Sequence, residues 1–192
     1  MAAAQKHRQA IIDAAVDLFR RQGYSGTGLN DVVRASGAPK GSLYHYFPDG
    51  KASIAEAAVL EAGTRVANTV EQLSAKATSC GELVKAHAVL LAGWMAKSGW
   101  QDGSPVTTVI LEMAPENAAV TEAGRQVFAA WRQVIKVQLI RDGFDDHRAE
   151  RLAFLCTAVI EGALVQSRVE KSAQPLLTAS EELGLLLEAT SR

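Results

Sequence analysis

The stretch from Leu29 to Phe47, LNDVVRASGAPKGSLYHYF, predicts two short helices joined by a tight turn. Leucine and valine residues in its first half recur at three- and four-residue steps, which puts them on one face of a helix. Gly37 tolerates the left-handed backbone that ends many helices. Pro39 has a fixed φ that suits the first turn of the next helix. The stretch is therefore a candidate helix-turn-helix.

The second predicted helix runs from Pro39 to Phe47 and has only about two turns. Leu43 and Phe47 lie four residues apart and can pack on the first helix. The remaining polar side chains then face outward: Lys40, Ser42, Tyr44 and His45. A helix this short is not stable alone in water, whereas a DNA major groove about 12 Å wide admits one α-helix. Groove or phosphate binding is thus one interpretation, and a solvated helical hairpin is the other.

The longer run from Ile11 to Phe47 resembles the DNA-binding domain of TetR-family transcriptional repressors. Three features carry the resemblance: the pattern AAxxLFxxxGY, the apolar spacing of the next helix, and KGSLYHYF. The segments PDGKASIAEAA and GSPVTTVILE are similar to the LmrA/YxaF-type subgroup, whose members resemble drug-responsive repressors. The family usually has Ser or Thr where Pro39 stands, and proline cannot supply that side-chain cap.

The resemblance implies that the helix beginning near Pro39 reads operator DNA. We assign Tyr44 and His45 to the groove or its phosphate rim, and Ser42 to either. Thr27 and the free amides that follow it are candidates for a phosphate contact, and for Lys51 a solvated lysine is the alternative. The predicted DNA-binding residues are Thr27, Lys40, Gly41, Ser42, Tyr44, His45 and Lys51.

The composition favours an all-α fold, because alanine, leucine and valine dominate and no long alternation of β-branched residues occurs. Apolar spacing predicts about nine helices. The stretch VTTVILEM at 106–113 has strand propensity, but a lone strand has no pairing partner, so we expect a short buried helix. The predicted domains are a helix-turn-helix domain at residues 1–50 and a ligand-binding and dimerisation domain at residues 51–192.

The charges are unevenly distributed around a net charge of −1. Residues 1–51 carry seven basic and four acidic side chains, whereas the remainder carries 13 and 17. A positive end on an acidic body suits a DNA-binding head, although chance fluctuation is an alternative. The two cysteines form no CxxC pair, which fits reduced thiols. Without a signal peptide or an 18-residue apolar run, we expect a cytoplasmic protein and no membrane partner.

The body of the chain has no catalytic or metal-binding motif, because its histidines are scattered singly. We therefore expect no enzyme activity, no cofactor and no metal. The resemblance implies a ligand pocket between helices, although core packing explains each aromatic residue equally well. A glutamate buried beside aromatics would favour a cationic or hydrogen-bonding ligand. The ligand candidates are Trp94, Val109, Glu112, Met113, Phe128, Trp131 and Glu161, with His87 and Gln138 as weaker ones.

The last two predicted helices have apolar residues beyond one face. The family pairs such helices with their two-fold mates, and a two-fold dimer suits a palindromic operator. The predicted interface residues are Leu155, Val159, Ala163, Gln166, Leu183 and Leu187.

The function predicted from these features is that of a homodimeric repressor which binds double-stranded operator DNA and is released by a small hydrophobic or cationic inducer. A DNA-binding regulator without an inducer, acting as an activator or architectural protein, is the alternative.

Overall fold

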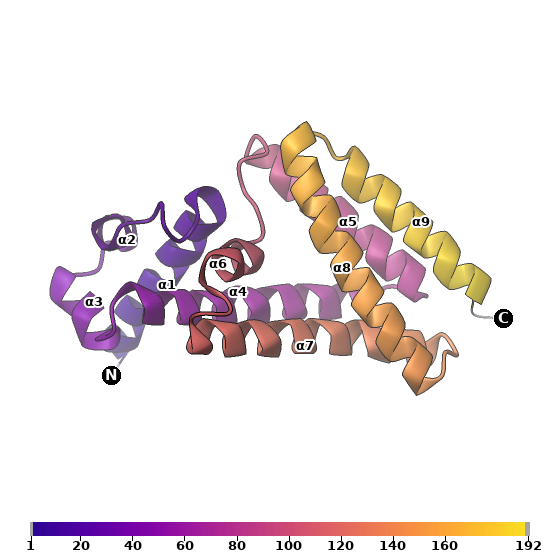
Figure 1. Cartoon of the computed structure of the whole chain (residues 1–192), viewed down its shortest axis with the longest axis horizontal. Coiled ribbons are helices and arrows are strands. Elements are labelled where there is room, and N and C mark those ends of the chain that lie inside the picture. Colours follow the sequence, from indigo (N-terminus) through magenta and orange to yellow (C-terminus); the bar gives the residue numbers. More distant parts are fainter. Residues whose placement is uncertain (1, 191–192) are drawn as a thin grey trace. The chain divides into compact units, whose positions relative to one another are not determined.

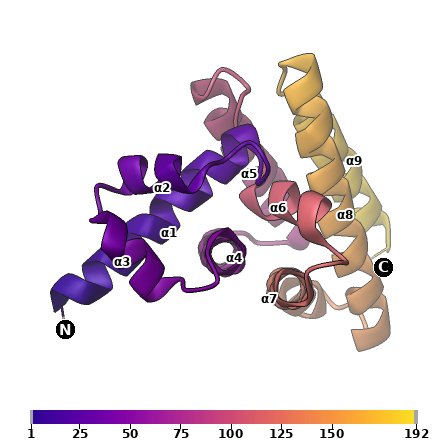
Figure 2. The same ribbon diagram turned by 60° about the vertical axis from the view of Figure 1, so that its left-hand side comes forward.

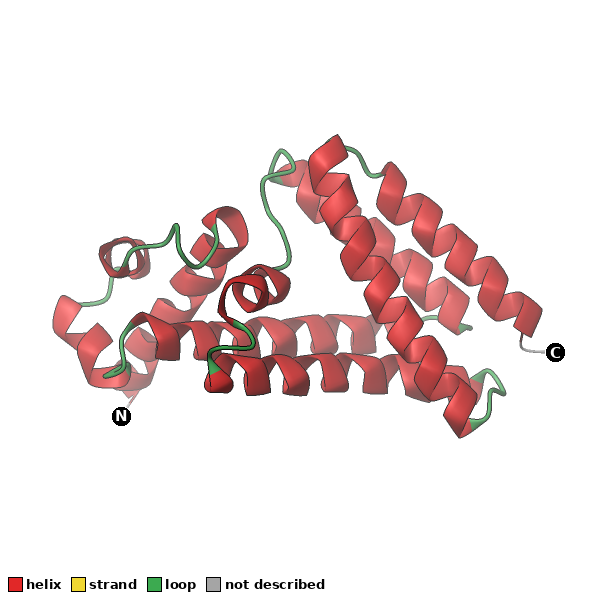
Figure 3. Cartoon of the chain, in the orientation of Figure 1, coloured by secondary structure: helices red, strands yellow, loops and turns green. Residues whose placement is uncertain are grey.

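A computed structural model describes residues 2–190 of the chain, with side chains at residues 6–189. This part consists of helices joined by turns and loops, with no strand (Figure 3). In chain order the helices are α1 (Ala2–Gln22), α2 (Leu29–Ser36), α3 (Lys40–Tyr46), α4 (Lys51–Ser74), α5 (Cys80–Lys97), α6 (Pro105–Met113), α7 (Ala118–Arg141), α8 (Asp146–Glu170) and α9 (Gln174–Thr190). The all-α prediction is confirmed.

The stretch with strand propensity forms helix α6. Its first turn is set by Ser104, whose side chain accepts a hydrogen bond from the Thr107 amide, and by Pro105 at the start of the helix. Both are strong helix-start signals. Val106, Val109 and Met113 are buried, so the apolar residues follow the helical period. The prediction of a short buried helix is thus confirmed.

The chain forms two compact units, which are described separately. The first unit contains Met1–Thr64 and Ser104–Val127, and the second contains Arg65–Gly103 and Phe128–Arg192. Helices α4 and α7 each contribute residues to both units. Compactness does not report which residues bind DNA, so the functional boundary after residue 50 stays a prediction.

In the first unit, α1 packs against α2, α3 and α6 (Figures 1 and 2). Ile11, Phe19, Val32 and Leu43 are fully buried there. They hold α2 and α3 on α1, because burying a large aliphatic or aromatic side chain contributes about 1.5–3 kcal/mol. The short helix α3 is therefore stabilised by packing on its neighbours.

In the second unit, α5, α8 and α9 pack together, and α8 and α9 run side by side (Figures 1 and 2). Leu83, Leu139, Leu152 and Leu176 are its largest fully buried side chains. Helices α5 and α9 approach closely, since a Cβ on Gly81 would lie 3.3 Å from the Cα of Gly184.

Helix α8 corrects the expectation that the chain has no apolar run of 18 residues. Within the described residues it contains an 18-residue window of mean hydropathy 1.4, long and apolar enough to cross a membrane by length and composition. A core helix can have the same composition, and Leu152 and Ile160 of α8 are indeed buried in the second unit.

Candidate recognition helix and ligand cavity

Helix α3 begins after a sharp change of chain direction. Gly37 has φ of 63° and ends α2 in the left-handed conformation, which glycine adopts without the Cβ penalty. Pro39 precedes α3 in an extended conformation and provides no side-chain cap, as the sequence predicted. Inside α3, Leu43 is fully buried, and Phe47 directly after the helix is 3% exposed. These two residues fix one face of α3 against the first unit.

The other face of α3 is open to solvent. Lys40, Gly41, Tyr44 and His45 are exposed, and Ser42 is half-buried. Residues four apart share a helix face, so lysine and tyrosine lie together, as do glycine and histidine. A Cβ built on Gly41 would meet nothing within 4 Å. This exposed face therefore carries a lysine ammonium, a tyrosine phenol and a histidine imidazole, and Gly41 leaves open space on it.

Thr27 lies in the loop from Gly23 to Gly28, here called the α1–α2 loop. Its side chain is 1% exposed, and its hydroxyl donates to the Gly23 carbonyl at 2.7 Å. The hydroxyl is thus directed into the protein. The structure gives this residue a role in closing the loop, and its predicted phosphate contact stays a prediction.

Lys51 also serves the α1–α2 loop. Its Nζ donates to the carbonyl oxygens of Tyr24 at 2.8 Å and Thr27 at 2.9 Å. The same ammonium lies 4.1 Å from the centre of the Tyr24 ring, where it gains a cation–π attraction. Its predicted contact with phosphate stays a prediction, because the described contacts use the ammonium within the first unit.

Glu112, a predicted ligand residue, holds the same loop from α6. Its carboxylate oxygens accept hydrogen bonds from the amides of Tyr24 and Ser25, each at 2.7 Å. Partial burial acts to raise the pKa of Glu112. The hydrogen bonds from Ser25 and Tyr24 and the nearby charge of Lys51 outweigh it and hold the pKa below its ordinary value. The structure thus assigns this carboxylate a partner that the sequence did not predict.

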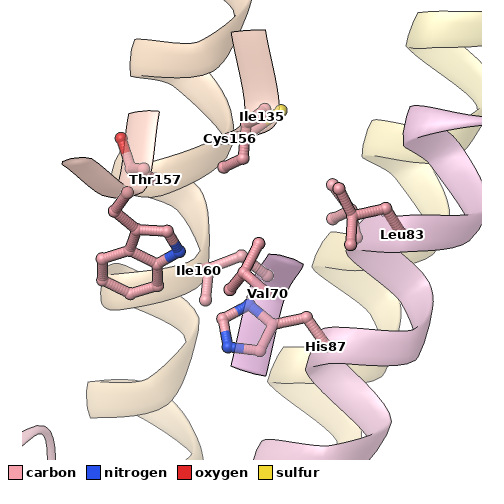
Figure 4. A pocket seen from close by; sticks show the side chains of 9 residues that line it. Val70, Leu83, His87, Ile135, Cys156, Thr157 and Ile160 are labelled. Carbon is pink, nitrogen blue, oxygen red and sulfur yellow. The ribbon is translucent and has the colours of Figure 1, made fainter. Parts of the chain in front are cut away.

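A small cavity with a free volume of about 10 Å³ lies in the second unit, between α4, α5, α7 and α8 (Figure 4). Most of its walls are aliphatic. It is lined by Val70, Leu83, Val84, His87, Trp131, Ile135, Cys156, Thr157 and Ile160. One of the predicted ligand residues, Trp131, is among them. His87, which the sequence ranked lower, also lines the cavity, and Figure 4 shows its imidazole beside Val70.

The polar groups of the cavity are few and uncharged. Burial lowers the pKa of His87 to about 4, so its imidazole is neutral near pH 7. The Thr157 hydroxyl donates to backbone carbonyls of its own helix. The Nε1–H of Trp131 is buried, and no group among the described residues accepts a hydrogen bond from it. The His87 ring meets the Trp131 ring edge-on, with centroids 5.7 Å apart.

Two buried thiols lie beside this cavity. A hydrogen bond between Cys80 and Cys156, together with burial, raises the pKa of the Cys80 thiol. Both cysteines are free, and Cys156 is one of the residues that line the cavity. Within the described residues, no group of three or more His, Cys, Asp or Glu side chains could hold a metal ion.

The other predicted ligand residues do not line the cavity. Val109 and Met113 are buried in the first unit through α6. Trp94 is 45% exposed on α5, and Glu161 is half-buried on α8. Phe128 lies outside the lining but stacks on Trp131, with ring centroids 6.4 Å apart. The structure thus separates residues that the sequence grouped together.

Gln138, the second weaker candidate, has a structural partner. It is buried, and its side-chain oxygen accepts a hydrogen bond from the Ser74 hydroxyl at 2.9 Å. This bond joins α4 and α7 within the second unit, so the residue is already paired away from the cavity lining.

The predicted interface residues fall into two groups. Ala163, Leu183 and Leu187 are buried within the chain itself, in the hydrophobic core of the second unit. Leu155 and Gln166 are exposed and Val159 is half-buried. Further apolar side chains are exposed on these two helices: Phe154, Val165, Val169, Leu177, Leu185 and Leu186. An apolar surface of this kind is typical of an interaction site.

Comparison with known proteins gives matches at both ends of the chain. The description "Bacterial regulatory proteins, tetR family" matches residues 11–58. The description "Transcriptional regulator LmrA/YxaF-like, C-terminal domain" matches residues 81–182.

Whole-length relatives agree with these matches. The HTH-type transcriptional regulator YxaF of Bacillus subtilis is 33% identical over 180 residues, covering 94% of each chain. LmrA of the same organism is 33% identical over 181 residues, covering 94% of this chain and 96% of that protein. A solved TetR regulatory protein from Rhodobacter sphaeroides has a TM-score of 0.81 at 24% identity, covering 92% of this chain and 96% of that one. The last match shows the fold.

Proposed function

The chain belongs to the TetR family of transcriptional regulators, with an LmrA/YxaF-like C-terminal domain, and from that premise we propose a ligand-responsive repressor. It binds palindromic operator DNA in the cytoplasm as a homodimer, and a small molecule in the second unit releases it. The observation that carries the proposal is that one side of α3 faces solvent, because Leu43 and Phe47 are buried on the opposite side.

Helix α3 enters the major groove in this proposal. Tyr44 and His45 reach base edges or the phosphate rim, Lys40 contacts phosphate, and Ser42 serves either. Gly41 lets the DNA backbone approach. We leave Thr27 out of the contact set because its hydroxyl is already paired with Gly23.

A dimer is proposed because two recognition helices must reach half-sites about 34–36 Å apart, or a multiple of that distance. The exposed apolar side chains of α8 and α9 supply a surface that a second copy can cover in a two-fold arrangement. Leu155 is the apolar residue of the predicted interface that is exposed, at 39%.

The response to a ligand is proposed to act through α4. This helix carries Val70, which lines the cavity, and Lys51, which holds the α1–α2 loop. A ligand shifts the equilibrium between DNA-binding and released conformations only by its different affinity for the two. It must therefore fit the cavity better in the released conformation.

Operator binding is tested by fluorescence anisotropy with a labelled duplex from the protein's own promoter region. We expect Tyr44→Ala to weaken binding at least about tenfold, since a base contact is worth about 1–3 kcal/mol, and to leave the fold intact. Trp94→Ala, which removes an exposed aromatic from α5, is the matched control and keeps the affinity. Equal affinity for wild type and Tyr44→Ala would remove Tyr44 from the site.

The dimer is tested by light scattering after gel filtration. We expect Leu155→Glu to convert the dimer into a monomer, because burying an unpaired carboxylate in an apolar interface is costly. Leu111→Glu, at a leucine of α6 that is 76% exposed, keeps the dimer mass. A wild type that is monomeric at every concentration would refute the dimer.

A regulator without an inducer is the second candidate. It is favoured by the small cavity volume of about 10 Å³, which is far below the roughly 300–1,000 Å³ of typical ligand sites. No thermal stabilisation across a broad compound library would favour this alternative. A reporter gene under the neighbouring promoter separates repression from activation.

A further inference from the structure

We propose that Arg8 of α1 is a further DNA-binding residue, which donates to a backbone phosphate beside the end of helix α3. This inference rests on the DNA-binding part of the proposed function and extends it to a residue outside the helix-turn-helix. Three observations support it: the position of the guanidinium, its partners within the protein and the charges around it.

Arg8 lies beside the end of α3, although the two are far apart in the sequence. Helix α1 packs against α3 (Figures 1 and 2). The Cζ atom of Arg8 is 5.5 Å from the centre of the Phe47 ring, and Phe47 directly follows α3. The ring is buried, whereas Arg8 is exposed. The ring therefore holds the guanidinium at the surface, next to the turn of α3 that carries the exposed His45.

The contact with Phe47 does not neutralise the charge of Arg8. An aromatic ring attracts a cation within about 6 Å but provides no anion. Among the described residues, no carboxylate forms an ion pair with Arg8. Other cations of this unit are used within the protein: Arg20 is paired with Asp17 at 3.1 Å, and Lys51 donates to two carbonyl oxygens. The planar guanidinium of Arg8 is thus suited to bidentate binding of a phosphate.

The surroundings of Arg8 are positive. Residues 1–12 include Lys6 and Arg8 and no aspartate or glutamate, and the first turn of α1 carries no acidic residue. The N-terminal end of a helix also has a partial positive charge. An anion is therefore attracted to this end of α1.

Arg8 and Lys40 lie at opposite ends of α3. Lys40 is the first residue of the helix and is exposed, whereas Arg8 lies against Phe47, which follows the last one. The 7 residues of α3 span roughly 10 Å, and the major groove is about 12 Å wide. With α3 in the groove, the two cations suit phosphates on its two walls.

Arg8→Gln removes the charge and nearly keeps the length of this exposed side chain. Anisotropy titrations with the labelled promoter duplex, between about 50 and 300 mM salt, give the salt dependence of binding. One phosphate contact contributes about 0.9 to the slope of log affinity against log salt, so the slope should become shallower by about 0.9. Counted from about 1 M salt, this slope corresponds to an affinity about eightfold lower at about 0.1 M.

An unrelated duplex of the same length provides a second measurement, because phosphate contacts carry no sequence information. Arg8→Gln should lower the slope equally on both duplexes. Arg8→Lys keeps the charge and should keep the wild-type slope. Arg125→Gln on α7 is the matched control, since it removes an exposed arginine that is paired with Glu122, and it should keep the slope as well.

Phe47 is the positioning residue in this proposal. Phe47→Leu removes the ring and keeps a large apolar side chain, so that Arg8 is ordered only when DNA binds. Ordering a long side chain on binding lowers affinity by about two- to tenfold. Arg8→Gln should therefore cost at least about twofold less affinity in the Phe47→Leu background than in the wild type. An equal cost in both backgrounds would refute the positioning role of the ring.

A purely structural role of Arg8 gives a different result. Arg8→Gln would then lower the melting temperature, measured by circular dichroism, and leave the salt slope at the wild-type value. That result would overturn the inference. An equal loss of slope in Arg125→Gln, or a shallow slope in Arg8→Lys, would overturn it too, because the effect would then not come from a cation at this position.

The same titrations separate this inference from the proposed function. If Tyr44→Ala weakens operator binding while Arg8→Gln keeps the slope, operator recognition holds and the phosphate contact fails. If the wild type binds both duplexes equally and Arg8→Gln lowers both slopes, the phosphate contact holds and operator recognition fails. Absence of binding to either duplex would refute both.

Discussion

Glu112→Gln tests whether the carboxylate on α6 holds the α1–α2 loop. Glutamine has nearly the same shape, but its amide has only one acceptor oxygen. That oxygen can accept from Tyr24 or from Ser25, and the NH₂ group then faces the other backbone N–H. The variant therefore loses one hydrogen bond and the attraction to Lys51.

The expected cost follows from the contacts. A hydrogen bond to a charged group is worth about 1.5–3 kcal/mol, and a neutral one about 0.5–1.5 kcal/mol. Because Glu112 is exposed, water compensates part of the loss, and we expect about 1–2 kcal/mol. That range corresponds to a factor of about 5–30 in a local opening equilibrium.

Hydrogen exchange measures this opening at the two amides. We expect the amides of Tyr24 and Ser25 to exchange about 5–30 times faster in Glu112→Gln than in the wild type at pH 7. Glu116→Gln, at an exposed glutamate in the turn after α6, is the control and should leave both rates unchanged. The operator affinity of Glu112→Gln should fall by no more than the same factor.

The pH dependence provides an independent check. The pKa of Glu112 is held below its ordinary value of 4.5, so its stabilising effect is present above 4.5. It is lost as pH falls through the lowered pKa of the folded state. The exchange rates of wild type and Glu112→Gln should therefore converge in acid. Equal rates at pH 7, or a difference that stays constant into strong acid, would contradict a role for the carboxylate.

Two further predictions concern stability. Burial lowers the pKa of His87 from 6.5 to about 4, so as pH falls His87 is protonated in the unfolded chain before it is protonated in the folded protein. The free energy of unfolding should therefore fall between pH 6.5 and 4 by on the order of 3 kcal/mol. Urea titrations of His87→Phe should show a smaller decline over the same pH range. A methyl group on Gly63 would overlap the side chain of Val127, so Gly63→Ala should destabilise the protein by about 1–3 kcal/mol. At Gly93 nothing lies within 4 Å of an added Cβ, so Gly93→Ala should be neutral or stabilising by up to about 1 kcal/mol. Equal urea midpoints for the two variants would contradict the close contact between Gly63 and Val127.

The helices were predictable because their end signals are local. Gly37 and Pro39 mark the turn between α2 and α3, and the structure has a left-handed glycine and an extended proline there. The stretch that became α6 needed a second argument, since its β-branched residues favour a strand. A lone strand leaves its backbone unpaired, and the helix start at Ser104 and Pro105 agrees with this reasoning.

The roles of Lys51 and Glu112 were not predictable, because they depend on contacts between distant parts of the sequence. Glu112 lies 87 residues from Ser25 along the chain, and the pair forms only because α6 packs on α1. Lys51 lies 24 residues from Thr27. A lysine after a recognition helix has the same sequence signature whether it contacts phosphate or two carbonyl oxygens.

The cavity shows which part of a site the sequence does contain. Leu83 and His87 lie four residues apart on α5, as do Trp131 and Ile135 on α7, and Cys156 and Ile160 lie four apart on α8. Each pair therefore marks one helix face that spacing can predict. A step of one residue rotates that face by about 100°, so choosing aromatic residues by type mixes faces, as Trp94 and Trp131 illustrate. The spacing of residues does not show which helix faces pack against one another. For the face that carries His87, this is determined by the packing of α5 with α8 and α9.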